Sequence, residues 1–392
     1  MANTAQMNPG LHHVGYRFPN TSFTDQLPEE VKQMVNLKFK TAVVVNRTVF
    51  VGNVQKTDLK GQVTVEGDSM YKSGVAKFDQ FADFRRVEVS VRDGDEIVKL
   101  EEYADRILQF KKDKMHLVNV SQDVEFLEDT FMHKGVKHPA AVCKTDYGVA
   151  WVNNLGCYLY DGQKVNNLLE KGGRQIIKES LWATFTTNQP MIGYIPKKRQ
   201  LLIVDDNTTT GTGNVFLYDL VTKSWVEGGD ATAVSEELTN FVTDWNGDLV
   251  YGYTNSASIV FQKWADASAT STGLSLETKD IDFGQPGQRK KVHKVLVTYT
   301  TAASGGVASV VTVKYDTNGR GTFDKTFADG TNFSSNVLGS ANGWQVAELK
   351  PGTSSEANNI KSFQLKFSTA GTVPVGFQIN DISIIYRLKP PK

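Results

Sequence analysis

A hairpin pattern recurs along the chain at a regular spacing. The run GNVFLYDLVTKSWVE, residues 213–227, alternates apolar and polar side chains and turns at residues 222–224. Alternation with a period of two is typical of a half-buried β-strand. Similar runs follow one another through much of the chain, at residues 39–54, 105–120, 147–162, 200–220 and 247–264. The first three are predicted to turn at Asn46–Arg47, Lys112–Asp113 and Asn153–Asn154. The chain is therefore predicted to consist largely of antiparallel hairpins, and its fold class to be all-β.

The spacing of these hairpins predicts their architecture. Their second strands have equivalent starts at His116, Cys157, Val215 and Ile259, which lie 41, 58 and 44 residues apart. The longer interval contains NTTTGTGN, residues 207–214, which is interpreted as a loop insertion. A period of about 40–45 residues with four strands per unit is the spacing of β-propeller blades. Residues 36–268 are therefore predicted to form a β-propeller of five or six blades, with two stacked β-sandwiches as the alternative.

Each blade of a propeller has two apolar faces that only its neighbours can cover. Large aromatic side chains on the repeated strands are predicted to fill the space between blades. This predicted inter-blade core comprises Trp151, Tyr158, Tyr160, Phe216, Tyr218, Trp225 and Trp264.

The chain after the repeats has a different character. Residues 265–275 are small and polar, as in a linker. Five or more strands without the repeat spacing follow, so residues 269–392 are predicted to form an antiparallel, jelly-roll-like β-sandwich. The last segment, residues 377–388, contains Ile379, Ile382, Ile384 and Ile385 and is predicted to belong to the core. Residues 1–35 are predicted to be an N-terminal arm with a short helix at 27–35, and a second helix, interrupted by two glycines, is predicted within 167–185.

Composition excludes several classes of protein. Lysine plus arginine and aspartate plus glutamate both total 43, so no net charge draws the chain to nucleic acid or to a membrane. It contains no long apolar segment and no signal-peptide pattern, which predicts synthesis in a cytoplasm and no membrane segment. Cys143 and Cys157 are too few for a disulfide framework or a four-cysteine zinc site. Because they lie two strands apart in a predicted sheet, both are expected to be free, buried thiols.

The motifs of catalysis and metal binding are weak. The loop at residues 316–324 resembles a calcium loop, but Arg320 occupies a position that requires an oxygen ligand, so a hairpin loop is favoured. The pair His133 and His138 flanks KGVK without neighbouring ligands. The aspartates that could serve a glycosidase all adjoin turns, where aspartate bonds locally: Asp205, Asp206, Asp244 and Asp248. The sequence therefore predicts no catalytic residue, no metal site and no cofactor.

One basic cluster could contact a polyanion. Arg289, Lys290, Lys291 and Lys294 lie together where the second unit begins. Such side chains can bind a nucleic acid backbone. Alternating lysines are also common on the solvent-exposed face of a strand, and this interpretation of the cluster is favoured.

Several phrases of the sequence resemble a family of tailed-bacteriophage structural proteins. They are SGVAKFDQFADF (73–84), DGDEIVKLEEYADRILQFKKDKMHLVNVS (93–121), GVKHPAAVCKTDYGVAWVNNLGCYLYDGQKVNNLLEK (135–171), MIGYIPKKRQLLIV (191–204) and TKDIDFGQPGQRKKVHKVLVTY (278–299). The resemblance is to propeller-bearing tail proteins, similar to the tail-nozzle and packaged-DNA-stabilisation proteins of short-tailed phages. It covers roughly residues 40–300, with a weaker echo in INDISIIYR near the C-terminus.

The resemblance implies a non-enzymatic part of the virion tail, made in the host cytoplasm. Such a part would form a ring-like homo-oligomer, with a hexamer favoured, as a nozzle, hub or plug that retains and channels packaged DNA. Its expected partners are other tail, adaptor or connector proteins, with transient contact to phage DNA. The alternative is a receptor- or carbohydrate-binding propeller of the tail, and a glycan-depolymerising enzyme is less favoured.

Overall fold

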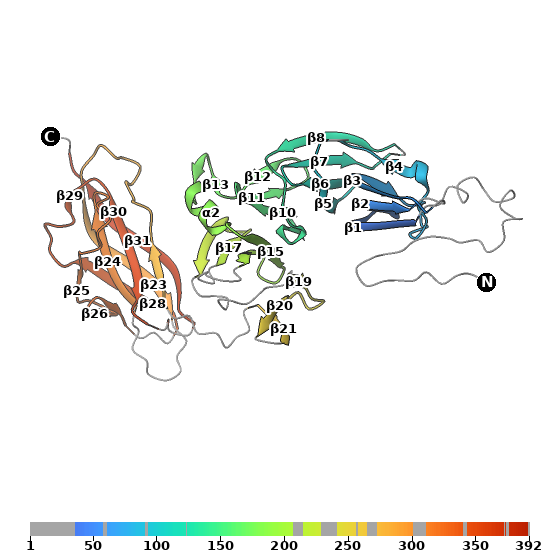
Figure 1. The fold of residues 1–392 in the computed structure, drawn as a ribbon. Coiled ribbons are helices and arrows are strands. Elements are labelled where there is room, and N and C mark those ends of the chain that lie inside the picture. Colours follow the sequence, from blue (N-terminus) through green and yellow to red (C-terminus); the bar gives the residue numbers. More distant parts are fainter. Residues whose placement is uncertain are drawn as a thin grey trace, which may run out of the picture. The chain divides into compact units, whose positions relative to one another are not determined.

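The computed structural model describes residues 36–57, 61–90, 93–122, 124–206, 215–228, 241–255, 258–264, 273–300, 311–339, 343–371, 373 and 376–390. The predicted arm 1–35 with its helix, the predicted loop insertion 207–214 and the predicted domain boundary between residues 268 and 269 lie outside these residues. The chain divides into two compact units, residues 1–264 and 265–392. The described elements are almost all strands (Figure 1), so the prediction of an all-β chain is confirmed.

Unit 1 is a series of small antiparallel sheets, each formed by consecutive strands. Sheet 1 contains β1 (Asn36–Val45), β2 (Thr48–Thr57), β3 (Val63–Lys72) and β4 (Arg86–Val87). Sheet 2 contains β5 (Ile97–Tyr103), β6 (Arg106–Lys111), β7 (Lys114–Asn119) and β8 (Phe126–Met132). Sheet 3 contains β9 (Val142–Thr145), β10 (Gly148–Asn153), β11 (Gly156–Tyr160) and β12 (Val165–Asn167). Sheet 4 contains β15 (Gln189–Ile195), β16 (Gln200–Asp206), β17 (Val215–Asp219) and β18 (Ser224–Gly228).

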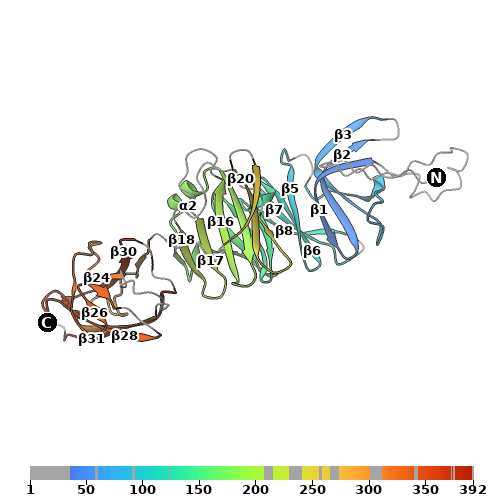
Figure 2. The same cartoon turned by 90° about the horizontal axis from the view of Figure 1, so that it is seen from below.

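Sheet 5 has three described strands, β19 (Val242–Thr243), β20 (Leu249–Asn255) and β21 (Ser258–Lys263). The four positions that the sequence aligned, His116, Cys157, Val215 and Ile259, all lie on the third strand of their sheets. The first strand of each sheet contacts the first strand of the next, from β1 to β5, β9, β15 and β19. Figure 2 shows sheets 1, 2 and 4 one after another in chain order within unit 1.

Local sequence explains the hairpins. β1 ends at Val45 and β2 begins at Thr48, which confirms the predicted turn at Asn46–Arg47. Both turn residues have positive φ, 48° and 61°. Positive φ at both central positions is the type I′ geometry that matches the twist of the strands. The predicted turn at Lys112–Asp113 is confirmed in the same way, between β6 and β7.

The predicted helix at 167–185 is wrong over its first half. Residues 170–175 form a small hairpin, β13 (Glu170–Lys171) and β14 (Arg174–Gln175), that turns at Gly172 and Gly173. Both glycines have positive φ, which a helix does not allow. Only α2 (Glu179–Phe185) is helical. The remaining short elements in the described part of unit 1 are the 3₁₀ turns η2 (Asp83–Arg85) and η3 (Pro139–Ala141).

Unit 2 contains two five-stranded antiparallel sheets that share one hydrophobic core. One sheet has the order β22 (Ser275–Glu277), β30 (Phe363–Thr369), β24 (Val311–Thr317), β27 (Val337–Leu338) and β26 (Phe333–Ser334). The other contains β25 (Phe327–Ala328), β28 (Gln345–Pro351), β23 (Lys290–Thr300) and β29 (Asn358–Ile360), and β31 (Gln378–Leu388) pairs with β23.

The C-terminal strand β31 contributes to this core with part of its predicted face. Ile379, Ile382 and Ile384 are half-buried and pack against the core of unit 2. Ile385 is 41% exposed, so its predicted place in the core is wrong. Successive side chains of a strand point to opposite faces, and Ile385 follows Ile384 directly.

Candidate functional site

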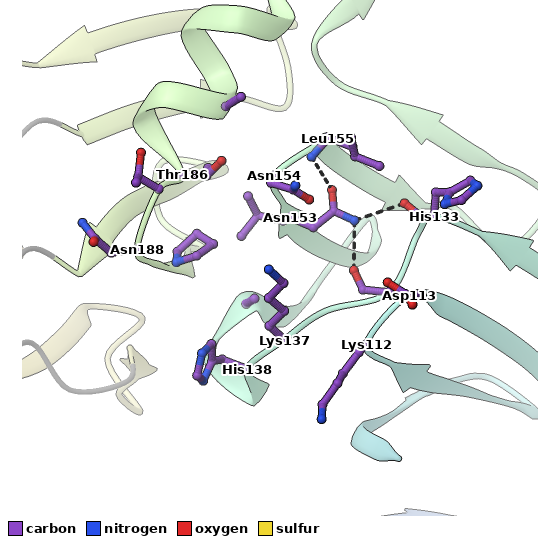
Figure 3. A pocket seen from close by; sticks show the side chains of 16 residues that line it. Lys112, Asp113, His133, Lys137, His138, Asn153, Asn154, Leu155, Thr186 and Asn188 are labelled. Atoms are coloured by element: carbon purple, nitrogen blue, oxygen red, sulfur yellow. Dashed lines mark hydrogen bonds between the residues drawn. The ribbon is translucent and has the colours of Figure 1, made fainter. Parts of the chain in front are cut away.

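A cleft of about 440 Å³ lies where sheets 2, 3 and 4 of unit 1 meet (Figure 3). Four segments line it: the turn of Lys112 and Asp113, the segment 133–141 after β8, residues 152–155 around the β10–β11 turn, and residues 183–190 from α2 to β15. These segments are far apart in the sequence, so the cleft is a product of tertiary packing. Its volume falls in the range of about 300–1,000 Å³ typical of small-molecule sites.

The segment after β8 is fixed by a close backbone approach. His133 has a φ of 61°, which turns the chain out of the strand. A Cβ atom at Gly135 would lie 2.4 Å from the main-chain oxygen of Lys111, so only glycine fits there. The next amide, Val136, donates a 2.9 Å hydrogen bond to the same oxygen. This wall of the cleft is therefore anchored to the end of β6.

Asn153 joins three walls of the cleft. Its Nδ2 donates to the main-chain oxygens of His133 at 3.2 Å and Gly135 at 2.9 Å (Figure 3). Its Oδ1 accepts hydrogen bonds from the amides of Leu155 and Gly156, which closes the β10–β11 turn. Its main-chain oxygen accepts the indole N–H of Trp182 from α2 at 2.9 Å. Asn153 therefore holds the cleft in shape.

The wall formed by α2 is also tied down. The Thr186 hydroxyl donates to the main-chain oxygen of Trp182 at 3.0 Å. The amide and the Nδ2 of Asn188 both donate to Oδ2 of Asp205, at 3.2 and 2.9 Å. Asp205 is thus bonded to a residue 17 positions earlier in the chain, just before the facing strand β15.

Other side chains at the cleft keep their polar ends available. Within the described part of the chain, the side chains of Lys137, His138, Asn154 and Asp113 form no hydrogen bond or ion pair. Figure 3 shows Lys137 extended toward the Asn153–Asn154 turn. Lys112 is directed away from this turn and pairs with Glu96 at 3.1 Å. The cleft therefore presents an ammonium, an imidazole, an amide and one carboxylate to whatever enters it.

Six of the aromatic residues predicted for the inter-blade core lie on sheets 3 and 4, and Trp264 directly follows β21 of sheet 5. Trp151 and Tyr158 are cross-strand partners with ring centroids 5.6 Å apart. Tyr218 and Trp225 are partners at 4.8 Å. Tyr160 and Phe216 are buried, while Trp225 and Trp264 are half-buried.

Sequence reasoning missed the residue at the centre of this cluster. Trp182 of α2 is fully buried and its ring lies 5.7 Å from those of Phe216 and Trp225. The run LWATF contains the signal, a tryptophan on the apolar face of a short helix. It could have been found if the helix had been considered as cover for the sheets.

The predicted basic contact patch needs a correction. Lys290 is completely buried, and its ammonium donates to the main-chain oxygens of Gln285, Gln288 and Lys361 at 2.6–2.9 Å. Because its ammonium is hydrogen-bonded to three internal carbonyls, Lys290 is not available to a partner. Arg289 is exposed, Lys291 is half-buried, and Lys294 pairs with Glu348 at 3.3 Å.

The aspartates of sheet 5 are engaged by lysines and by their own turn. Asp244 accepts the amides of Asn246 and Asp248 through Oδ1, at 2.9 and 2.8 Å. Asp248 pairs with Lys197 at 2.6 Å and with Lys263 at 3.0 Å. These pairs hold the pKa of Asp248 below its ordinary value.

Among the described residues, no three His, Cys, Asp or Glu side chains are grouped so that they could hold a metal ion. The same residues contain no helix of the length and apolarity needed to span a membrane. Cys157 is buried and Cys143 half-buried, and both thiols are free.

Comparison with known proteins gives weak structural similarities. No family model matches the chain, and no curated protein matches its sequence. Two similar solved structures are Hsv2 from Kluyveromyces marxianus (11% identity, 60% of this chain and 77% of that chain, TM-score 0.36) and Hsv2p from Kluyveromyces lactis (10%, 60% and 76%, TM-score 0.34). A third is the exo-beta-1,3-galactanase Pc1,3Gal43A from Phanerochaete chrysosporium, crystallised with galactose (9%, 88% and 95%, TM-score 0.29).

The last similarity corrects one prediction. The sequence predicted that the chain is not an enzyme. This prediction is wrong, because an enzyme is among the structural matches of the chain. A TM-score of 0.29 at 9% identity assigns no activity to this chain.

Proposed function

We propose that the chain is a structural component of a phage virion tail, a nozzle, hub ring or plug that assembles with itself and with neighbouring tail proteins. In this proposal the sheets of unit 1 are five blades of a β-propeller, unit 2 is a β-sandwich, and the assembly helps to retain and channel packaged DNA. The sequence resemblance supports the tail role. One structural observation supports assembly, the exposed apolar side chains on the outer face of sheet 5 in the described structure.

The two faces of sheet 5 differ in burial. Leu249 and Tyr251 on one face are buried, and Leu249 packs in one cluster with residues of sheet 4. Val242, Ile259 and Phe261 share the opposite face by strand register, and they are 62%, 67% and 76% exposed. Sheets 2 to 4 each lie between two neighbours, whereas sheet 5 ends the series within unit 1.

An apolar face of this kind favours a protein partner. Burying a Val, Ile or Phe side chain stabilises a complex by roughly 1.5–3 kcal/mol. β21 is also the edge strand of the described sheet, and exposed apolar edge strands are association sites. The partner proposed here is a second copy of this chain, because a ring of identical subunits requires such a surface.

Sedimentation and light scattering of the purified full chain test self-assembly. We expect an oligomer whose mass falls to that of the monomer in Phe261→Ser. Phe78→Ser is the matched control, because Phe78 is also exposed, at 53%, but lies on the segment after β3. A wild-type chain that stays monomeric at high concentration would overturn self-assembly. Immunoelectron microscopy of virions tests the location, and label on the capsid faces would contradict the tail role.

Receptor or carbohydrate binding by the tail is the second candidate, and one residue favours it. Trp245 is 96% exposed at the tip of the turn between Asp244 and Gly247. Exposed aromatic rings at loop tips can stack on sugar rings. Trp245→Ala should then abolish signals on a glycan array, and an array without signal for the wild-type chain would argue against this candidate.

A further inference from the structure

We propose that the cleft between sheets 2, 3 and 4 binds an acidic saccharide, a sugar that carries a carboxylate. This site is separate from the outer face of sheet 5 and does not depend on the tail role. The inference rests on the kinds of groups that the cleft presents and on their fixed positions.

The cationic part of the cleft selects for negative charge. Lys137 extends into the space beside the Asn153–Asn154 turn, and its ammonium has no partner among the described residues (Figure 3). His138 adjoins it on the same segment and also lines the cleft. An ammonium without a carboxylate partner gains a charge-assisted hydrogen bond when an anion enters.

The remaining groups select for hydroxyls on the same ligand. The carboxylate of Asp113 lines the cleft and has no hydrogen-bond donor within the described structure. A simple anion such as phosphate would place negative charge near this carboxylate, whereas a sugar hydroxyl would donate to it. The free amide of Asn154 can both donate to and accept from a sugar.

Apolar surface completes the requirements of a sugar site. Leu155, Ala183 and Pro190 contribute apolar atoms to the same cleft. These atoms can pack against the C–H face of a pyranose ring. The cleft thus combines cation, carboxylate, amide and apolar surface, which together match a ring with both hydroxyls and a carboxylate.

The walls are held in place without a ligand. Asn153 ties the segment 133–135 to the β10–β11 turn and to α2, and Gly135 packs against the end of β6. A site fixed in advance loses less conformational entropy on binding.

Isothermal titration calorimetry with digalacturonate tests the proposal on the full chain. We expect saturable binding of digalacturonate and no heat from neutral galactobiose. Lys137→Ala should weaken binding about tenfold or more, as expected for the loss of a charge-assisted bond. Lys137→Arg, which retains the charge, should restore most of the affinity.

Two further variants make the test specific. Lys198→Ala removes an exposed lysine at the far end of the β15 hairpin and should leave binding unchanged. Asp113→Asn should weaken digalacturonate binding but improve the binding of inorganic phosphate. If phosphate binds the wild-type chain as tightly as digalacturonate, the cleft is a simple anion site and the proposal is wrong. Equal affinity for galactobiose, or no binding of digalacturonate at millimolar concentration, would also overturn it.

Discussion

The indole Nε1 of Trp225 donates a 2.8 Å hydrogen bond to the main-chain oxygen of Leu168, 57 residues earlier in the chain. Trp225 lies on the edge strand of sheet 4, and Leu168 directly follows the edge strand of sheet 3. The amide of Leu168 in turn donates to the oxygen of Cys157 in the middle of sheet 3. A single side chain therefore connects two successive sheets by a polar bond as well as by packing.

This bond and its packing can be separated by mutation. Trp225→Phe removes the donor but keeps an aromatic ring, and it should lower the free energy of unfolding by about 1 kcal/mol. Trp225→Ala also removes the contacts with Tyr218 and Trp182, and it should cost about 2–4 kcal/mol. Urea unfolding followed by circular dichroism measures both. Trp245→Ala, at a fully exposed tryptophan, should change stability by less than about 0.5 kcal/mol.

Glu96 should make the chain sensitive to acid below about pH 4.5. Its carboxylate accepts hydrogen bonds from Lys40 and Asn53, both at 2.8 Å, and these bonds and the pair with Lys112 lower its pKa to about 2. The folded state thus releases its proton more readily than the unfolded chain. Stability from this group is present above pH 4.5 and is lost as the pH falls toward 2.

Glu96→Gln should flatten the loss of stability between pH 4.5 and pH 2, as measured by thermal unfolding across this range. Glu227→Gln, at an exposed carboxylate of β18, is the control and should leave the slope unchanged. An unaltered slope in Glu96→Gln would show that this carboxylate does not contribute.

His116 should make the stability of the fold depend on pH in a higher range than Glu96 does. It is 3% exposed on β7 and its Nδ1 lies 2.9 Å from the Thr130 hydroxyl. Burial, followed by the charges of Lys111 and Lys114, lowers its pKa to about 4. Between pH 6.5 and pH 4 the unfolded chain therefore binds a proton that the folded chain does not, so stability falls as the pH falls through this window.

Proton NMR titration of the imidazole should show His116 neutral down to about pH 4. His116→Gln should remove the loss of stability between pH 6.5 and pH 4, while His293→Gln, at an exposed histidine, should retain it. Titration of His116 near pH 6.5 would contradict the prediction.

Lys290 should be essential for unit 2. Lys290→Met leaves three main-chain oxygens without their donor, and it should cost about 2–4 kcal/mol. Hydrogen exchange of the amides of β23 and β31 reports this locally. Lys291→Met is the neighbouring control, and in this variant the amides of β23 and β31 should exchange as in the wild-type chain. Equal protection in the two variants would mean that the three carbonyl bonds of Lys290 add nothing.

Sequence reasoning succeeded where structure is local. Strand alternation and turn residues such as Asn46 and Arg47 act over a few positions, so the hairpins and the equivalence of His116, Cys157, Val215 and Ile259 could be found. It failed at residues 167–178, where the pattern of apolar residues is compatible with both a helix and a hairpin. The positive φ of Gly172 and Gly173 selects the hairpin. It also failed at Lys290, whose burial depends on carbonyls from residues 285, 288 and 361.

The cleft was beyond prediction for a similar reason. In the sequence His133 and His138 form a pair, but Lys137 between them has no apparent role. Asn153 is predicted only to be part of a turn. Its bonds to His133, Gly135 and Trp182 arise when three sheets pack, and no spacing in the sequence specifies them.

The contacts of unit 1 run from each sheet to the next, so its stability is a sum of neighbouring interfaces. Sheet 5 lies at the end of that series, so its free energy of local opening should be low and its strands should open first. Under the assembly proposal, a partner on its outer face adds a second interface to sheet 5. Assembly would then also stabilise this last sheet. Sheet 5 should therefore open more often in a free subunit than in an assembled one, even where the two have the same fold.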